Sequence, residues 1–117
     1  MKRDEQIRDI KVFKTEFIRF YESQILKVQD KIDQVFTILK YQKQVPIKFF
    51  KKLNGFENLY EIRVITAFKS IRIMCFKEGD QLIILTHAFV KKSQKTPKKE
   101  LNKALNLKKE YYERQID

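Results

Sequence analysis

The stretch "LYEIRVITAFKSIRIMCFKEGDQLIILTHAF", Leu59–Phe89, decides the fold. It contains three runs rich in β-branched and aromatic residues, "LYEIRVI", "IRIMCF" and "QLIILTHAF", which are separated by short polar breaks. Runs of this composition predict strands, and short breaks between them predict antiparallel neighbours. We therefore expect a three-stranded antiparallel meander in the second half of the chain.

The segment before the meander predicts one strand followed by helical structure. Ile7–Phe13 is short and partly β-branched, which is typical of a strand. After Thr15, a candidate helix N-cap, apolar residues recur in steps of three and four from Phe17 to Leu39. This period predicts a helical stripe that ends near Gln42. The stripe fits one long helix or two helices packed as a hairpin, and the periodicity does not decide between them.

Two further segments predict helices. "PIKFFKKLNG", Pro46–Gly55, predicts a short helix that its proline opens and its glycine closes. "TPKKELNKALNLKKEYYERQ" predicts a C-terminal helix with Thr96 as cap and Pro97 at the first helical position. The order of strand, helices, meander and helix, without a repeat or a long linker, predicts a single α+β domain over residues 1–117.

The net charge of +11 is unevenly distributed. Residues 40–54 hold five lysines and no acid, and residues 91–117 hold nine basic and four acidic residues. Residues 55–90 are balanced, with four of each sign. Two basic segments that flank a neutral middle suit a polyanion such as nucleic acid. Charge that merely solvates exposed helices gives the same composition, so this pattern alone leaves both interpretations open.

The sequence lacks the motifs that are typical of several classes of protein. With one cysteine and one histidine, the chain has neither a disulfide framework nor a zinc motif, and Cys75 is expected in the core rather than as a nucleophile. No P-loop, GxGxxG, HExxH or GxSxG string is present. The charged N-terminus has no signal-peptide pattern, and the longest aliphatic run, "LIIL", is far too short to span a membrane. We expect a cytoplasmic protein without a membrane segment.

Strand register predicts which polar side chains of the meander meet. A two-residue turn at residues 67–68 places Arg63 opposite Arg72, and one at residues 79–80 places Arg72 opposite His87. One face then carries the three in a row, with Lys91 just beyond the strand end. The other face is an apolar surface for the helices to cover, made of Ile62, Val64, Ile71, Ile73, Cys75, Leu82, Ile84 and Ala88.

The row of basic side chains has two interpretations. Glu61 lies on the same face and neutralises one arginine if the row is a surface ion-pair ladder, an arrangement that contributes little stability. Arginine also offers a planar fork for phosphate oxygens, and histidine exchanges a proton near neutral pH. Because His87 shares the row and basic segments flank it, we favour a phosphate site.

Three strings of this sequence resemble a known family. "LNGFENLYEIRV", "SIRIMCF" and above all "LTHAFVKKSQKTPKKEL" are similar to the HigB-like, phage-derived branch of the RelE/ParE toxin superfamily. The resemblance runs from about Leu53 to the C-terminus. Ile71 stands where that branch usually has tyrosine, and Ala88 where it has glycine. No departure removes a charged residue of the predicted site, although Ala88 changes the backbone environment beside His87.

The resemblance implies an α+β toxin of a type II toxin–antitoxin pair that enters the ribosomal A site and cleaves mRNA without a metal or other cofactor. It also implies an antitoxin partner, for which we expect a small helix-turn-helix protein. Among the candidate catalytic residues, Arg63 and Arg72 stabilise phosphate charge and His87 acts as acid or base. The candidate RNA-binding residues are Lys51, Lys52, Lys91, Lys92 and Lys95. The alternatives are a non-cleaving, ParE-like inhibitor of DNA gyrase and a plain RNA-binding module.

Overall fold

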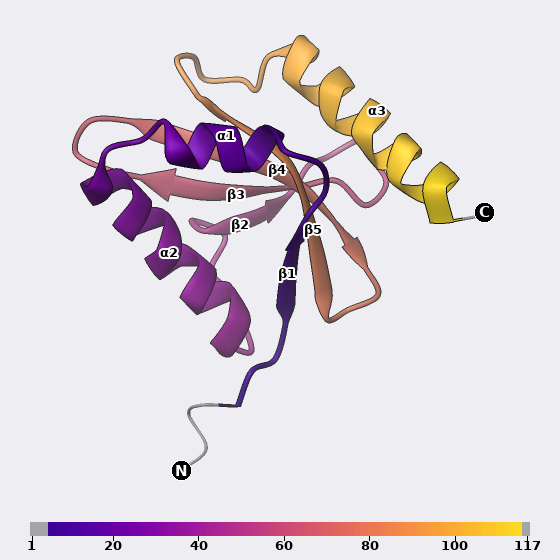
Figure 1. Cartoon of the computed structure of the whole chain (residues 1–117), viewed down its shortest axis with the longest axis horizontal. Coiled ribbons are helices and arrows are strands. Elements are labelled where there is room, and N and C mark those ends of the chain that lie inside the picture. Colours follow the sequence, from indigo (N-terminus) through magenta and orange to yellow (C-terminus); the bar gives the residue numbers. More distant parts are fainter. Residues whose placement is uncertain (1–4, 116–117) are drawn as a thin grey trace.

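The protein folds around one mixed sheet, as a computed structural model of the chain shows for residues 5–115 (Figure 1). In chain order the elements are β1 (Asp9–Val12), α1 (Glu16–Glu22), α2 (Leu26–Tyr41), β2 (Phe50–Lys52), β3 (Tyr60–Ile65), β4 (Ser70–Glu78), β5 (Leu82–Val90) and α3 (Lys98–Gln115). The strands are ordered β1-β5-β4-β3-β2, with β1 parallel to β5 and the other neighbours antiparallel. The predicted α+β class and the meander β3–β4–β5 are confirmed.

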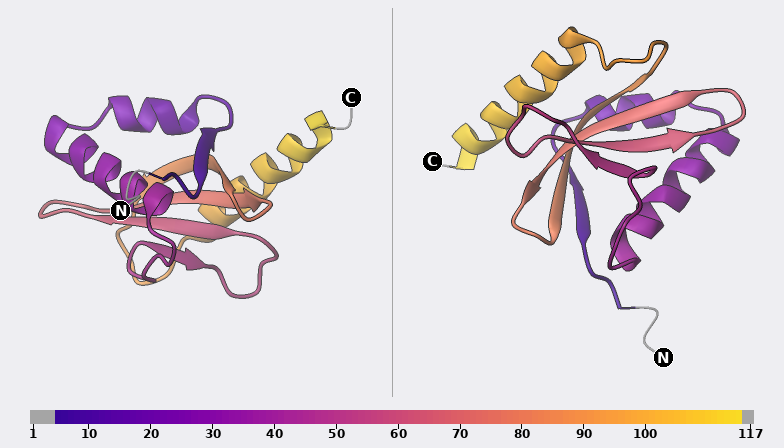
Figure 2. Two further views of the ribbon diagram at one scale, coloured as in Figure 1. Left: turned by 90° about the horizontal axis from the view of Figure 1, so that it is seen from below. Right: turned by 180° about the vertical axis from the view of Figure 1, so that it is seen from behind.

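The helices α1 and α2 cover one face of the sheet (Figure 2, left). Successive strand residues point to opposite faces, so one set of alternate side chains meets these helices. This first core joins Phe17, Val28, Ile32, Val35 and Leu39 of the helices to Ile62, Val64, Ile71, Ile73, Cys75, Ile83 and Leu85 of the strands. Burial of the Cys75 thiol in this core raises its pKa, which supports the prediction that it serves packing.

The long helical stripe is two helices. The chain turns at residues 23–25, and the Ser23 hydroxyl donates a hydrogen bond to the carbonyl of Phe20 at 2.6 Å. A serine that binds the carbonyl three residues back competes with helix continuation, which accounts for a break without glycine or proline. Thr15 does precede α1, but its side chain makes no capping hydrogen bond.

The predicted short helix at Pro46–Gly55 is wrong. One turn forms, with the amide of Phe49 bonded to the carbonyl of Pro46 at 2.9 Å, and the chain then enters strand β2. Lys51 pairs with Glu61, and the amide of Arg63 donates to the carbonyl of Phe49 at 2.8 Å. The edge of β3 therefore supplies hydrogen bonds that a local helical preference cannot match.

The C-terminal helix α3 covers the other face of the sheet. It packs Ala104 against Leu59, Met74 and Phe89, and Tyr111 against Phe76 and Ile84. By hydrogen bonding the helix begins one residue later than predicted, because Pro97 provides the first carbonyl, which Leu101 contacts at 3.2 Å. The basic run between Val90 and Lys98 is thus the crossing from the sheet to this helix.

The register of β4 on β5 differs from the predicted one. The turn has three residues, since Glu78 pairs with Leu82, and this extra residue places Ile84 on the α3 face instead of the first core. A bulge between Met74 and Cys75 then restores the parity. Beyond the bulge Arg72 lies opposite Phe89, and His87 lies opposite Met74. The predicted direct pairing of Arg72 with His87 is wrong, yet both residues share the α3 face.

Candidate nucleic-acid interface

The centre of the site is a buried carboxylate between two arginines. Arg63 lies opposite Arg72 on adjacent strands, as predicted. Glu61 Oε1 accepts a hydrogen bond from Arg63 Nε at 2.9 Å and lies 3.5 Å from Arg72 Nε. The Thr96 hydroxyl donates to Glu61 Oε2 at 3.2 Å, and the Glu61 side chain is only 2% exposed. One carboxylate thus holds two guanidinium groups side by side. Without it, the repulsion between their like charges would disfavour this arrangement.

Arg72 is held by its other contacts as well. Its Nη1 donates to Ser70 Oγ at 3.1 Å and to the carbonyl of Ile71 at 3.2 Å. Its Nε is buried and makes no hydrogen bond, because the Glu61 oxygen beside it is outside bonding geometry. Burial lowers the pKa of Arg72, although an arginine side chain stays charged at neutral pH. A buried donor without an acceptor is costly, and such groups concentrate at functional sites.

Two adjacent surface hollows open over the arginine pair. One, of about 310 Å³, is lined by Lys51, Glu61, Arg63, Lys91 and Lys95 among others. The next, of about 480 Å³, is lined by Ser70, Arg72 and Lys92 together with Lys91 and Gln94, which both hollows share. Lys91 therefore lies where the two hollows meet. Together these hollows, referred to below as the basic cleft, bring four of the five predicted RNA-binding lysines to the two arginines.

Lys52 is the exception among the predicted lysines. It pairs with Tyr60, whereas its neighbour Lys51 pairs with Glu61. Residues opposite one another share a face, so Lys51 points to the basic cleft and Lys52 to the opposite side of the sheet. Lys52 lines neither hollow.

Lys91 has a lowered pKa. Partial burial is the main cause, and the positive charges of Arg72, Arg63 and Lys51 act in the same direction against the raising effect of Glu61. Its backbone amide donates to the carbonyl of Ser70 at 2.7 Å, which fixes the start of the basic run against β4. Only a neutral amine accepts a proton, and a lowered pKa increases the neutral fraction of Lys91 at a given pH.

His87 lies on the same face but outside the basic cleft. Its ring is covered by the first turn of α3, with Nε2 3.2 Å from Glu100 Oε1 and a side chain only 3% exposed. Its Nδ1 lies 3.2 Å from the Thr86 hydroxyl, which donates to the carbonyl of Met74 at 3.0 Å. The contact with Glu100 requires a hydrogen on Nε2. Burial lowers the pKa of His87, and the nearby Glu100 carboxylate opposes this effect in part.

The buried imidazole gives a prediction for stability. Because the folded protein disfavours the charged imidazole, the unfolded chain binds more protons below its ordinary His pKa of about 6.5. The free energy of unfolding should therefore fall as the pH drops through this value, and it should fall less in His87→Gln. Urea unfolding of both proteins at pH 7.5 and pH 5.5 measures the difference. Equal losses in the two proteins would show that His87 does not resist protonation in the fold.

Sequence reasoning gave Glu61 only a secondary part and missed Thr96 and Glu100. The spacing of Glu61, two residues before Arg63 on one strand, was the available signal, since it places both on one face. The packing of α3 and the segment before it on the sheet brings Thr96 and Glu100 to the site, and a single sequence does not predict how a helix packs on a sheet. Ser70 was likewise not predicted, although it lies two residues before Arg72 on the same strand.

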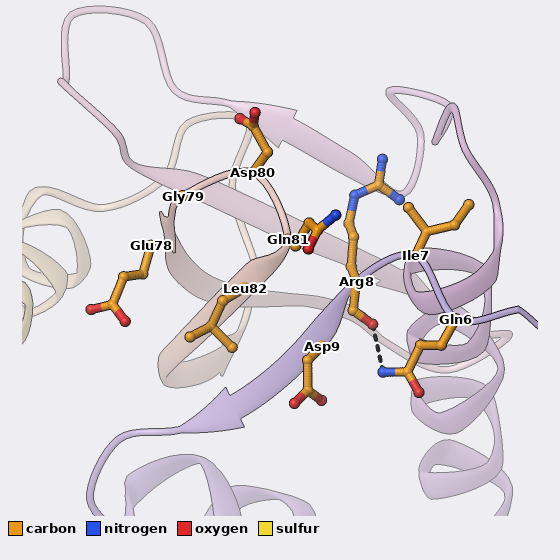
Figure 3. A pocket seen from close by; sticks show the side chains of 9 residues that line it. All are labelled: Gln6, Ile7, Arg8, Asp9, Glu78, Gly79, Asp80, Gln81 and Leu82. Atoms are coloured by element: carbon orange, nitrogen blue, oxygen red, sulfur yellow. Dashed lines mark hydrogen bonds between the residues drawn. The ribbon is translucent and has the colours of Figure 1, made fainter.

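A larger hollow lies at the other end of the β4–β5 hairpin (Figure 3). It has a volume of about 720 Å³ and is lined by residues 6–9 and 78–82. The carboxylates of Asp9, Glu78 and Asp80 point in different directions there. The Arg8 guanidinium donates instead to the backbone carbonyls of Leu39, Gln42 and Lys43 at 2.7–2.9 Å. These contacts tie the N-terminal segment to the end of α2.

Within residues 5–115, no three His, Cys, Asp or Glu side chains gather as they would around a metal ion. No helix in the same range is long and apolar enough to cross a membrane.

The fold and the basic cleft define a small α+β domain with an arginine-centred basic face. Residues 21–109 match the model of the family described as "Phage derived protein Gp49-like (DUF891)", so the chain belongs to this family. A comparison with curated protein sequences gives no match.

Two solved structures share the fold. One is the RelB–RelE antitoxin–toxin complex from Methanococcus jannaschii, with a TM-score of 0.53, 22% identity, and coverage of 68% of this chain and 88% of that one. The other is the archaeal RelE–RelB complex from Pyrococcus horikoshii OT3, with a TM-score of 0.54, 21% identity, and coverage of 72% and 94%. At this level of identity the likeness establishes a RelE-like fold.

Proposed function

We propose that the chain is the toxin of a type II toxin–antitoxin pair, of the HigB-like branch, and that it cleaves mRNA on the cytoplasmic ribosome. The observation that carries this proposal is the Glu61-centred pair of arginines beneath the basic cleft. The Gp49-like family and the RelE fold support it, because the fold is shared with a chain crystallised in antitoxin–toxin complexes. The proposed partners are mRNA, the ribosome and an antitoxin, which we expect to be a small helix-turn-helix protein.

The chemistry proposed for the cleft is attack of a ribose 2′ oxygen on the adjacent phosphate. The 2′ oxygen loses its proton and bonds to phosphorus, the bond from phosphorus to the 5′ oxygen breaks, and that oxygen leaves with a proton. Arg63 and Arg72 neutralise the charge that develops on the non-bridging oxygens, as preorganised donors held by Glu61. Lys91, which lies between the hollows and has a lowered pKa, is the proposed base.

The burial of His87 argues against its proposed role as a catalytic acid or base. An acid or base must come within hydrogen-bond reach of the proton it transfers. The His87 ring is occupied by Glu100 and Thr86, so contact with RNA requires movement of the first turn of α3. We propose instead that His87 positions the start of α3 through its contact with Glu100, because Thr96, two residues before α3, donates a hydrogen bond to Glu61 in the cleft.

Replacing Lys91 by methionine should slow cleavage by roughly 100-fold or more, the range typical of a lost acid–base group. The rate of the wild type should rise with pH toward the lowered pKa of Lys91, and Lys91→Arg should lose this rise because arginine does not deprotonate. Single-turnover cleavage of ribosome-bound mRNA between pH 6.5 and pH 9 measures both effects. Lys52→Met is the matched control, since Lys52 lies on the opposite side of the sheet. A wild-type rate in Lys91→Met contradicts the assignment of the base.

Induced expression separates the proposed function from the alternatives. We expect growth arrest with rapid loss of full-length mRNA and new mRNA ends within coding regions. DNA damage with intact mRNA would instead indicate a gyrase inhibitor. Intact mRNA without DNA damage, together with RNA affinity that falls steeply with salt, would indicate a plain RNA-binding module.

A further inference from the structure

Large apolar side chains are exposed at one corner of the molecule. Ile65 and Phe68 flank the tip of the β3–β4 hairpin with 58% and 69% of their surface exposed. Ile25 and Leu26, at the turn from α1 to α2, are exposed to a similar degree. The hairpin tip and the start of α2 lie at the same end of the molecule in each view (Figures 1 and 2). Exposed apolar groups gathered in this way mark interaction sites more often than single exposed residues do.

A groove of about 470 Å³ runs between the hairpin tip and α2. Val28 forms a buried part of its floor, and residues 65–68 form one wall. The tip is held in place, because Thr66 Oγ1 accepts hydrogen bonds from the amides of Phe68 and Lys69 at 3.1 and 2.9 Å. Lys69 Nζ donates to Gln24 Oε1 at 2.7 Å and joins the hairpin to the α1–α2 turn. The groove is therefore preformed, which lowers the entropic cost of docking.

The charge of the groove is positive. Lys27 and Lys31 of α2 line it, and their spacing of four residues places them on one helix face. Among the described residues neither lysine has a carboxylate within ion-pair distance. Two unpaired like charges on one face repel each other weakly, and an anionic partner removes that cost. An aliphatic floor with a lysine rim fits an amphipathic helix with flanking acids better than it fits a nucleic-acid backbone.

We propose that this groove is the docking site for an acidic amphipathic helix of the antitoxin. The inference rests on the proposed function for the identity of its partner and adds the surface and the chemistry of recognition. Ile65, which lines the groove, pairs with Ser70, whose hydroxyl accepts a hydrogen bond from Arg72 in the basic cleft. The groove opens toward α2, whereas the arginine pair lies on the α3 face of the sheet. A helix seated in the groove thus contacts Ile65, the strand partner of the residue that holds Arg72.

The test uses calorimetry to titrate the purified chain with a candidate antitoxin, the purified protein encoded by the reading frame next to the gene for this chain. Phe68→Ser should weaken binding about 30-fold, the effect of losing an aromatic hot-spot residue. Ile47→Ser is the matched control, because Ile47 is 67% exposed on a different surface. For the charge, Lys31→Glu should weaken binding, whereas Lys40→Glu, on the same helix but outside the groove, should leave it unchanged.

A growth assay keeps this inference separable from the proposed function. Phe68→Ser should arrest growth like the wild type but escape neutralisation when the neighbouring protein is co-expressed. If the wild type does not arrest growth, the proposed function fails, and the titration still decides the docking site. Equal affinities of Phe68→Ser and Ile47→Ser, or no binding by the wild type, overturn the docking site. A wild-type dimer that Phe68→Ser dissociates also overturns it and assigns the groove to a second copy of the chain.

Discussion

Arg72→Ala should abolish growth arrest and slow cleavage of ribosome-bound mRNA by roughly 100- to 1,000-fold, the cost of removing one preorganised donor from a charge-stabilising site. Arg72 is 7% exposed and borders the second hollow, with Nη1 fixed by Ser70 and the Ile71 carbonyl. Its guanidinium is thus positioned before RNA arrives. Among the neighbouring charges, that of Arg72 has the largest effect on the pKa of Lys91, so its removal should raise this pKa and leave less neutral amine to accept a proton.

Two further variants separate chemistry from folding. Arg72→Lys keeps the positive charge but loses the planar fork, and we expect most of the activity to be lost. Arg19→Ala removes an exposed arginine of α1 and should leave arrest unchanged. Thermal unfolding of each purified variant shows whether the fold survives. A folded Arg72→Ala protein that cleaves mRNA at the wild-type rate contradicts the proposed role of Arg72.

Glu61→Ala should lower the free energy of unfolding by about 3–5 kcal/mol, as is typical when one partner of a buried ion pair is removed. Glu61 is buried at the centre of the site and is the carboxylate beside both Arg63 and Arg72. Without it, the buried Arg72 lies opposite Arg63 with no compensating charge, and the Thr96 hydroxyl loses its acceptor. Urea unfolding monitored by circular dichroism measures the loss.

The loss in the free energy of unfolding distinguishes a buried ion pair from a solvent-exposed ion-pair ladder. A surface ion pair contributes about 0–1 kcal/mol, so a loss below 1 kcal/mol would mean that Glu61 is effectively solvated. Glu22→Ala, which removes an exposed carboxylate from α1, should change the free energy by no more than about 0.5 kcal/mol. Glu61→Gln keeps the shape but not the charge, and it should fall between the two.

The pairing of β3 with β4 was predictable, because strand alternation and a short connection leave few registers. Arg63 lies opposite Arg72 although Ala67 and Phe68 are poor turn residues. The Thr66 hydroxyl makes the turn workable by accepting the two amide hydrogen bonds described above. Because threonine often supports turns in this way, Thr66 is a signal in the sequence for this turn and hence for the register of β3 on β4.

The pairing of β4 with β5 was not predictable from local signals. Gly79-Asp80 suits a two-residue turn, but the turn also includes Gln81, and the bulge near Met74 compensates for the added residue. A bulge is a response to tertiary packing, here the requirement that one face meets two helices and the other meets α3. The shared face of His87 and Arg72 was predicted, whereas their direct pairing failed for this reason.

The burial of His87 and the formation of β2 also could not be predicted from the sequence. The position of His87 beneath Glu100 depends on how α3 crosses the sheet, and the basic run that precedes α3 fixes no angle. The segment after Pro46 has a local helical pattern, but it pairs with the edge of β3 and forms strand β2. In both places long-range packing overrode a local preference.

In the proposed reaction, the basic cleft cleaves ribosome-bound mRNA by attack of the 2′ oxygen. The most direct measurement incubates the purified chain with ribosomes programmed with a defined mRNA and identifies the chemical ends of the products. We predict a 2′,3′-cyclic phosphate on the upstream fragment and a 5′-hydroxyl on the downstream fragment, with neither formed by Arg72→Ala. Products with 5′-phosphate ends, or mRNA that stays intact beside the wild-type chain, would contradict this mechanism.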